Sequence, residues 1–284
     1  MTRIAKQLAI AAALAATVAT SATAGSVGFQ QIRNATVKIT YGGTTFLVDP
    51  MLAKAGSYPA FQGTYHSELR NPTVELPLPL EDVMRADAVI VTHTHLDHWD
   101  DGAKAALPKH IPLFAQNDED AASIRKAGFT DVRVLGPDSE FKGVRLTPVT
   151  GQHGTDQIMA ALGERLGKTV GIVFRQPGHK TVYIAGDTIW TPQVAGAIAQ
   201  YRPDVIVLNT GYARLKAFDG SIIMGKEDVE RAYHAAPQAT IIGSHMEALN
   251  HLTQTRQDLK DYVAEKGLDA QRVLVPADGE AYRF

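Results

Sequence analysis

The chain has 284 residues, 28 of them basic and 30 acidic, and it contains no cysteine. The absence of cysteine excludes disulfide bonds and thiolate metal ligands. Because 45% of the residues are hydrophobic, the chain has enough apolar material for a large folded core. The basic residues form no run or stripe, which argues against binding to nucleic acid.

The N-terminus has the pattern of a secretory signal peptide, which we assign to residues 1–24. Two basic residues precede an apolar run from Leu8 to Ala19, and Ala22-Thr23-Ala24 supplies the small residues that signal peptidase requires. The run is shorter than the roughly 20 residues that span a bilayer, so an uncleaved membrane anchor is the weaker alternative. We therefore expect an exported protein without stable membrane insertion, periplasmic if the host is a Gram-negative bacterium.

Short β-rich segments dominate the first part of the exported chain. We predict a hairpin from Thr36–Tyr41 and Thr44–Val48, because the paired glycines between them permit the positive φ that tight turns demand. Residues 51–80 carry several prolines and glycines and little periodicity, which predicts a long surface loop. The apolar run Ala88–Val91 predicts a buried strand.

Strands and helices then follow in groups. The predicted helices are Asp101–Leu107, Asp118–Ala127, Lys226–Ala236 and Thr253–Lys266. The predicted strands are Ile111–Ala115, Val132–Leu135, Val144–Val149, Val170–Phe174, Thr181–Ala185, Asp204–Leu208, Thr240–Ser244 and Val273–Val275. Two comparable halves of this kind indicate an α/β protein in which two sheets pack face to face with helices outside, a four-layer αββα sandwich. No linker separates the halves, so we predict one domain over residues 25–284.

A cluster of metal-ligand types follows the predicted strand that ends at Val91. His93, His95, Asp97 and His98 lie within six consecutive positions. Histidine is the commonest metal ligand and aspartate a usual companion. A strand end can aim two histidines at i and i+2 from one face, while the turn brings the other two side chains inward. We therefore predict a metal site with nitrogen and oxygen ligands, the alternative being a polar loop that is merely rich in histidine.

Three further strand ends supply candidate ligands: His153, Asp187 and His245. A rigid strand holds such a residue while the loop leaves it open to solvent, so sites in sheet proteins assemble at these positions. Taken singly each is ambiguous, and Asp187 after a glycine suits a turn or a helix cap. Their order in the chain, behind the histidine cluster, indicates that all three belong to the same metal site.

The sequence resembles the metallo-β-lactamase superfamily, whose members share the αββα sandwich and the cluster His93-Thr94-His95-Leu96-Asp97-His98. More narrowly, it is similar to the broad-specificity metal-dependent hydrolases that include ascorbate-phosphate lactonase, from about Ile32 to Phe284. The resemblance implies two divalent ions held by seven side chains: His93, His95 and His153 at one ion, Asp97, His98 and His245 at the other, and Asp187 bridging them.

The chain departs from this family's pattern in two ways. Many relatives carry glycine after the last histidine of the cluster, whereas Trp99-Asp100 follows here, which we expect to alter the rim of the pocket. The cysteine ligand of one class of di-zinc β-lactamases is absent, which argues against an antibiotic substrate.

The resemblance implies a metal-dependent hydrolase acting on a small molecule. Two divalent ions about 3.5–4 Å apart lower the pKa of a shared water toward 7, so we expect metal-bound hydroxide to attack a lactone, ester or phosphodiester. Asp97 is the candidate catalytic group, able to take a proton as the leaving group departs. Zinc is the expected metal, with manganese or iron as alternatives.

Other functions remain open at this point. The alternatives are an iron-dependent oxidoreductase on the same scaffold, a β-lactamase-type amide hydrolase, and a metal-binding module without turnover. The substrate must be chosen by the loops 51–80, 154–168 and 212–225, whose apolar side chains could form a lid, a satellite core or a dimer contact. His251 and Asn209 are placed to lie near the metals.

Overall fold

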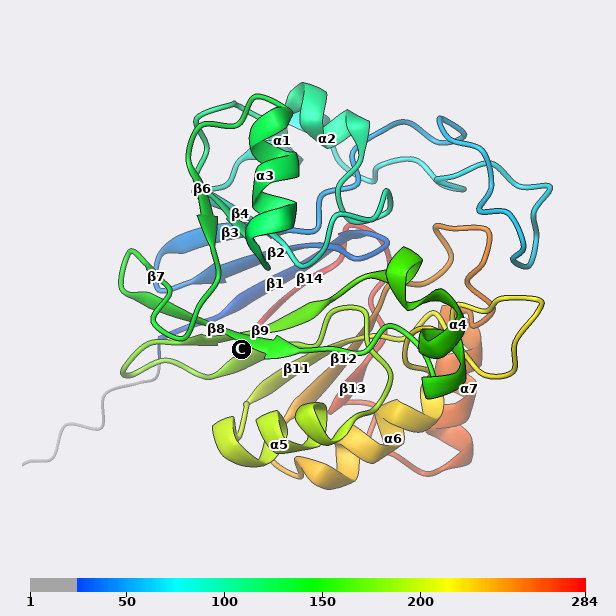
Figure 1. The fold of residues 1–284 in the computed structure, drawn as a ribbon. Helices are drawn as coiled ribbons and strands as arrows, with labels where there is room; N and C mark the ends of the chain where they lie inside the picture. The colour runs from blue at the N-terminus through cyan, green and yellow to red at the C-terminus, as the bar shows by residue number, and fades with distance from the viewer. Residues whose placement is uncertain (1–24) are drawn as a thin grey trace, which may run out of the picture.

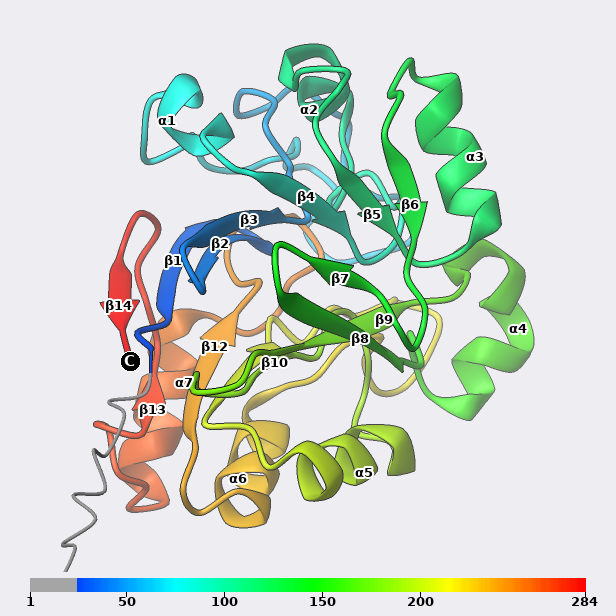
Figure 2. The ribbon, with the colours of Figure 1, turned by 90° about the vertical axis from the view of Figure 1, so that its left-hand side faces the viewer.

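A computed structural model describes residues 25–284, so the predicted signal peptide lies outside the described residues. Two mixed sheets of seven strands each form the centre (Figures 1 and 2). In order across the first sheet lie β14 (Ala281–Arg283), β1 (Gly28–Arg33), β2 (Thr36–Tyr41), β3 (Thr44–Val48), β4 (Ala88–Val91), β5 (Leu113–Ala115) and β6 (Val132–Val134). In order across the second lie β13 (Val273–Leu274), β12 (Thr240–Ser244), β11 (Val205–Asn209), β10 (Val182–Ile184), β9 (Val170–Arg175), β8 (Val144–Thr150) and β7 (Glu140–Phe141).

Helices cover the outer face of each sheet. On the first sheet lie α1 (Leu80–Met84), α2 (Asp101–Ala106) and α3 (Asp118–Lys126), and on the second lie α5 (Pro192–Tyr201), α6 (Lys226–Ala235) and α7 (Arg256–Glu265) (Figure 2). A seventh helix, α4 (Asp156–Leu166), follows β8 at one end of the sandwich. The predicted αββα sandwich is therefore confirmed. None of the helices described has the length and apolar character needed to cross a bilayer.

Apolar side chains between the sheets hold the two halves together. Phe46 of the first sheet packs edge-on against Phe174 of the second, with ring centroids 5.4 Å apart, and both side chains are fully buried. Ile90 and Val207 extend the same core across the middle of the interface. Burial on this scale is the main free-energy gain of folding, so it fixes how the sheet edges align.

The strand directions bring the carboxyl ends of several strands to one edge of the sandwich. In the second sheet β10, β11 and β12 are parallel, and β8 runs in the same direction because it is antiparallel to β9, as β9 is to β10. In the first sheet β3 and β4 are parallel neighbours. The segments that follow these strands meet at the edge where the two sheets face each other (Figure 1).

The hairpin prediction is confirmed and the reading of residues 154–168 as a loop is wrong. Tyr41 pairs with Thr44 across Gly42 and Gly43, whose φ angles are 56° and 77°, as a turn with two positive φ angles requires. Residues 156–166 form α4, because the Thr155 hydroxyl accepts the Ile158 amide at the N-cap and the apolar side chains recur at helical spacing. The prediction also omitted α1, α5, β1, β7 and β14.

The expectation that Trp99 and Asp100 shape the rim of the pocket is wrong. Trp99 is 1% exposed and packs against Phe129 beneath the helices of the first sheet. Asp100 is fully buried and caps α2 by accepting the Ala103 amide at 2.6 Å. The same carboxyl accepts the Leu52 and Ala53 amides, so it ties the start of the long loop 51–80 to the helix.

Replacing Asp100 by alanine should destabilise the protein more than an ordinary surface change. The substitution removes the helix cap and leaves the buried Leu52 amide and the half-buried Ala53 amide without an acceptor, which lowers the free energy of unfolding by about 3 kcal/mol. Urea unfolding followed by circular dichroism measures the change. The neighbouring Asp101, whose side chain is 74% exposed, is the matched control, and Asp101→Ala should cost less than about 0.5 kcal/mol. An equal decrease in the free energy of unfolding for the two variants would contradict this role of Asp100.

Candidate metal centre

Seven side chains converge at the edge where the strand ends meet. The histidine cluster follows β4, His153 follows β8, Asp187 follows β10 and His245 comes directly after β12. They form two groups, each able to offer ligand atoms that lie within 4.8 Å of one another: His93, His95 and His153 in one, and Asp97, His98, Asp187 and His245 in the other. The structure thus brings together all seven residues singled out from the sequence.

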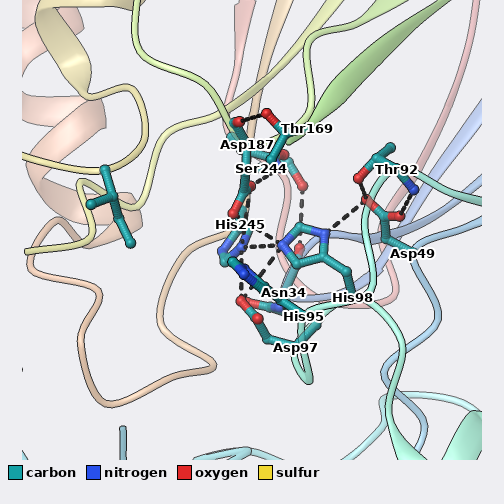
Figure 3. Close-up of polar contacts among 12 residues, drawn as sticks. Asn34, Asp49, Thr92, His95, Asp97, His98, Thr169, Asp187, Ser244 and His245 are labelled. Carbon is teal, nitrogen blue, oxygen red and sulfur yellow. Dashed lines mark hydrogen bonds and ion pairs between the residues drawn. The ribbon is translucent and has the colours of Figure 1, made fainter. Parts of the chain in front are cut away.

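Ligand atoms within each group lie close enough to share a centre. In the first group, His93 Nε2 lies 3.0 Å from His95 Nδ1. In the second, His245 Nε2 lies 3.2 Å from His98 Nε2 and 3.4 Å from the Asp97 carboxylate (Figure 3). Two neutral imidazoles can share one N–H between such nitrogens, whereas a cation placed between them would bind the lone pairs of both.

Asp187 lies between the two groups. Its Oδ2 is 3.1 Å from His98 Nε2 in the second group and 3.6 Å from His153 Nε2 in the first. Its Oδ1 accepts a hydrogen bond from the Asn209 side chain at 2.7 Å and lies 3.6 Å from His245 Nε2. One carboxylate therefore reaches ligand atoms of both groups, which is the geometry that a bridging ligand requires.

Contacts behind the ligands orient their rings. His98 Nδ1 donates to Asp49 at 2.8 Å and His153 Nδ1 donates to the Ile222 carbonyl at 2.9 Å, which leaves both Nε2 atoms facing the centre. A histidine that binds a metal usually donates its other ring N–H to a carboxylate or carbonyl in this manner. The arrangement therefore fits metal ligation through Nε2 at both residues.

Asp49 supports the ligand His98 but was not among the residues predicted from the sequence. Its carboxyl accepts both the amide and the hydroxyl of Thr92 at 2.7 Å, so the group that orients His98 is itself fixed (Figure 3). The only indication of its role is that it directly follows β3. Because β3 is the parallel neighbour of β4, the carboxyl ends of the two strands lie side by side. Asn34 was missed as well; its side chain donates to the Asp97 carbonyl at 2.9 Å, and its own carbonyl accepts the His245 amide.

Burial and mutual charge set the protonation of the site. Burial lowers the pKa of His153 to about 4, so this ring is neutral at pH 7. Burial also opposes a charged His98, but Asp187 and the other nearby carboxylates raise its pKa above the usual value. Although burial alone would raise them, the pKa values of Asp97 and Asp187 are lowered, chiefly by His98. The buried charge of these groups is net negative, which suits divalent cations.

A cavity of about 180 Å³ opens onto the two groups. Four of the seven side chains line it, and its remaining walls come from the three segments expected to select the substrate together with Leu96 and His251. These wall residues are Phe61, Gln62, Thr64, Leu96, Leu162, Arg165, Leu166, Leu215, Ile222 and His251. Ile158, Leu252 and other apolar residues behind the walls form a satellite core. Residues of the long loop, of α4 and of 212–225 thus take part both in the pocket and in a core.

Comparison with known proteins identifies the family. Residues 44–256 match the model of the Beta-lactamase superfamily domain. The chain is 45% identical over 256 residues to UPF0173 protein YddR of Bacillus subtilis, covering 89% of this chain and 98% of the relative. It is 26% identical over 211 residues to a UPF0173 metal-dependent hydrolase of Korarchaeum cryptofilum, covering 73% and 86%. The crystal structure of an isothiocyanate hydrolase from Delia radicum gut bacteria superposes with a TM-score of 0.87 at 45% identity, covering 90% of this chain and 99% of that one.

The chain therefore belongs to the beta-lactamase superfamily, and the resemblance seen in the sequence is confirmed. Within that superfamily it is a metal-dependent hydrolase of the UPF0173 group. The donor set of imidazole and carboxylate groups fits this class, because it needs no thiolate and suits zinc, manganese or iron.

Loss of Asp49 should weaken metal binding without removing a ligand. In Asp49→Ala the His98 ring loses the acceptor that fixes its orientation, and such changes typically reduce metal affinity 10–100-fold. Isothermal titration of metal-free protein with zinc measures the affinity. Asp87→Ala, which removes a partly exposed carboxylate that pairs with Lys142 at the surface, is the control. Unchanged zinc affinity in Asp49→Ala would show that the Asp49 contact does not orient a ligand.

Proposed function

We propose that this hydrolase binds two divalent cations and cleaves a small molecule at an electrophilic carbon, with isothiocyanates as the favoured substrate class. The observation that carries the proposal is the pair of ligand groups sharing Asp187 at the floor of a small cavity with largely apolar walls. The 45% identity to an isothiocyanate hydrolase over nearly the whole of both chains supports the choice of substrate.

Each group would hold one cation. His93, His95 and His153 would bind the first, Asp97, His98 and His245 the second, and Asp187 would bind both. Zinc suits this set of nitrogen and oxygen donors, and manganese and iron are the alternatives to be compared with it. When bound, the cations supply a water molecule of lowered pKa and a positive charge that polarises the substrate.

Asp97 is the proton carrier in this proposal. Its carboxylate lines the cavity as well as facing His98 and His245, at 3.5 Å and 3.4 Å. The lowered pKa of Asp97 keeps its carboxylate ionised at pH 7, which is the form that can accept a hydrogen bond from the attacking water. From the wall of the cavity the same group can pass a proton of that water to the substrate atom that leaves.

An isothiocyanate suits the cavity in shape and polarity. The group R–N=C=S is linear and uncharged, and its central carbon is the electrophile. Addition of water across the C=N bond places oxygen on carbon and hydrogen on nitrogen, and cleavage of the C–N bond in the resulting thiocarbamate releases an amine and carbonyl sulfide. Phe61, Leu162 and Leu215 offer apolar surface for the substituent R.

A lactone, ester or phosphodiester is the second candidate. These substrates also present an electrophilic centre to water, and Arg165 lines the same cavity. Its guanidinium would favour a substrate that carries a carboxylate or phosphate group. The two candidates differ in charge, so direct comparison separates them.

Turnover by the protein loaded with zinc, manganese or iron tests the proposal. Phenethyl isothiocyanate, a γ-lactone, a nitrophenyl ester and bis-nitrophenyl phosphate are compared at equal concentration. We expect the highest kcat/KM with the isothiocyanate, measured by loss of its absorbance and by release of the amine. Higher kcat/KM with the lactone or diester would favour the second candidate, and no turnover of any substrate with any of the metals would contradict both.

The same assay tests the role of Asp97. Asp97→Ala removes a ligand and the proposed proton carrier together, so kcat should fall by at least about 1,000-fold and one cation should bind more weakly. His110→Ala, at an exposed residue in the loop before β5, should leave turnover and metal content unchanged. Wild-type rates in Asp97→Ala would show that this mechanism is wrong.

A further inference from the structure

His251 lies in the wall of the cavity but belongs to neither ligand group. It is 6% exposed and lines the same cavity as Asp97 and His153. Its Nδ1 is buried and has no hydrogen-bond partner among the described residues. A buried polar atom without a partner is costly. Because the ring also lines the cavity, a molecule bound there could form a hydrogen bond with the imidazole that the described residues do not provide.

The surroundings hold the His251 ring in place. Phe61 packs edge-to-face against it, with ring centroids 4.9 Å apart and an interplanar angle of 89°. The His251 carbonyl accepts the Arg214 amide at 3.1 Å, so the backbone is fixed as well. The imidazole is therefore positioned before any substrate arrives, which is the condition for an effective hydrogen-bond donor in an active site.

Asn250 fixes the position of Phe61, whose ring packs against His251. Its buried side chain accepts the Phe61 amide at 3.0 Å and donates to Thr64 Oγ1 at 2.8 Å and to the Tyr65 carbonyl at 2.7 Å. These bonds join the segment after β12 to the long loop at the point where that loop enters the cavity wall. His251 and Phe61 thus belong to one rigid corner of the pocket.

The charge state of His251 matches the role of a donor. Burial lowers its pKa to about 4, so at pH 7 the ring is neutral and carries one N–H. A neutral imidazole can donate to a heteroatom that gains negative charge without adding repulsion beside the cations.

We propose that His251 donates a ring N–H hydrogen bond to the substrate heteroatom that gains negative charge as water adds to the electrophilic carbon. In an isothiocyanate nitrogen and sulfur share that charge, and we assign the hydrogen bond to the nitrogen, the atom that is protonated and leaves as the amine. The inference rests on the function proposed above and assigns a residue of the cavity wall, outside both ligand groups, that stabilises the substrate. His251 is then a catalytic residue that binds no metal.

Three substitutions at His251 test the proposal. His251→Leu removes the donor and keeps much of the volume, so kcat should fall about 100-fold, while zinc content stays that of the wild type. His251→Asn and His251→Gln place an amide N–H near the positions of Nδ1 and Nε2, and one of the two should recover at least tenfold in kcat. His110→Leu, at the exposed histidine before β5, should be indistinguishable from the wild type.

Binding of an inert analogue gives a readout that does not depend on turnover. N-phenethylthiourea, the ammonia adduct of the same isothiocyanate, keeps its heteroatoms and resists hydrolysis. By isothermal titration, the zinc-loaded His251→Leu variant should bind it at least tenfold more weakly than the wild type. If His251→Leu proves unstable, the Asn and Gln variants carry the comparison.

The outcomes distinguish this inference from the function on which it rests. An active wild type, with His251→Leu retaining kcat and thiourea affinity within twofold, overturns the role of His251 alone. Loss of zinc in all three variants also overturns it, because the residue would then support the metal site and not the substrate. A zinc-loaded wild type that neither cleaves the isothiocyanate nor binds the thiourea overturns both proposals.

Discussion

The buried carboxylate of Asp187 connects the packing of the two sheets to the geometry of the candidate metal centre. It extends from the end of β10 in the second sheet, yet its Oδ2 lies 3.1 Å from His98, which follows β4 of the first sheet. This contact exists only if the two sheets pack with their carboxyl ends at the same edge. Asp187 is 3% exposed, and an isolated buried carboxylate is costly, so the fold must supply positive or hydrogen-bonding partners around it. The histidines on both sides and the amide of Asn209 meet that requirement.

Support for the site comes from residues that never touch the cavity. Asp49 and Asn34 fix the positions of ligands through ring and backbone contacts. Asn34 lies in the turn between β1 and β2, and Asp49 directly follows β3 at the start of the long connection to β4. On the outer side, Asp100 holds the beginning of the long loop and Asn250 holds its middle. The loop has no helix or strand of its own between Met51 and Pro79. Its order comes from these buried polar side chains, which is why a long irregular segment can form a defined wall.

Much of the fold and the ligand set could be predicted from local sequence, because each signal involves neighbouring residues. The hairpin followed from Gly42-Gly43, and the seven ligand types stood directly behind apolar strands. The role of Asp49 could not be predicted in this way, because it depends on β3 lying parallel beside β4, which is a long-range pairing. The helix α4 was missed although Thr155 is a good helix start, because its apolar side chains were assigned to a loop beside the site. The helix α5 was left out of the prediction although Thr191-Pro192 is a typical helix start. The role of Asn250 depends on contacts 179–189 residues apart in the chain and leaves no local pattern.

We propose that Asp187 joins two cation sites into one centre, and anomalous diffraction at the zinc edge from crystals of the zinc-loaded protein measures this. We expect two peaks about 3.5–4 Å apart, one beside each group of ligands and with the Asp187 carboxylate between them. A single peak, or two peaks that do not share Asp187, would contradict it.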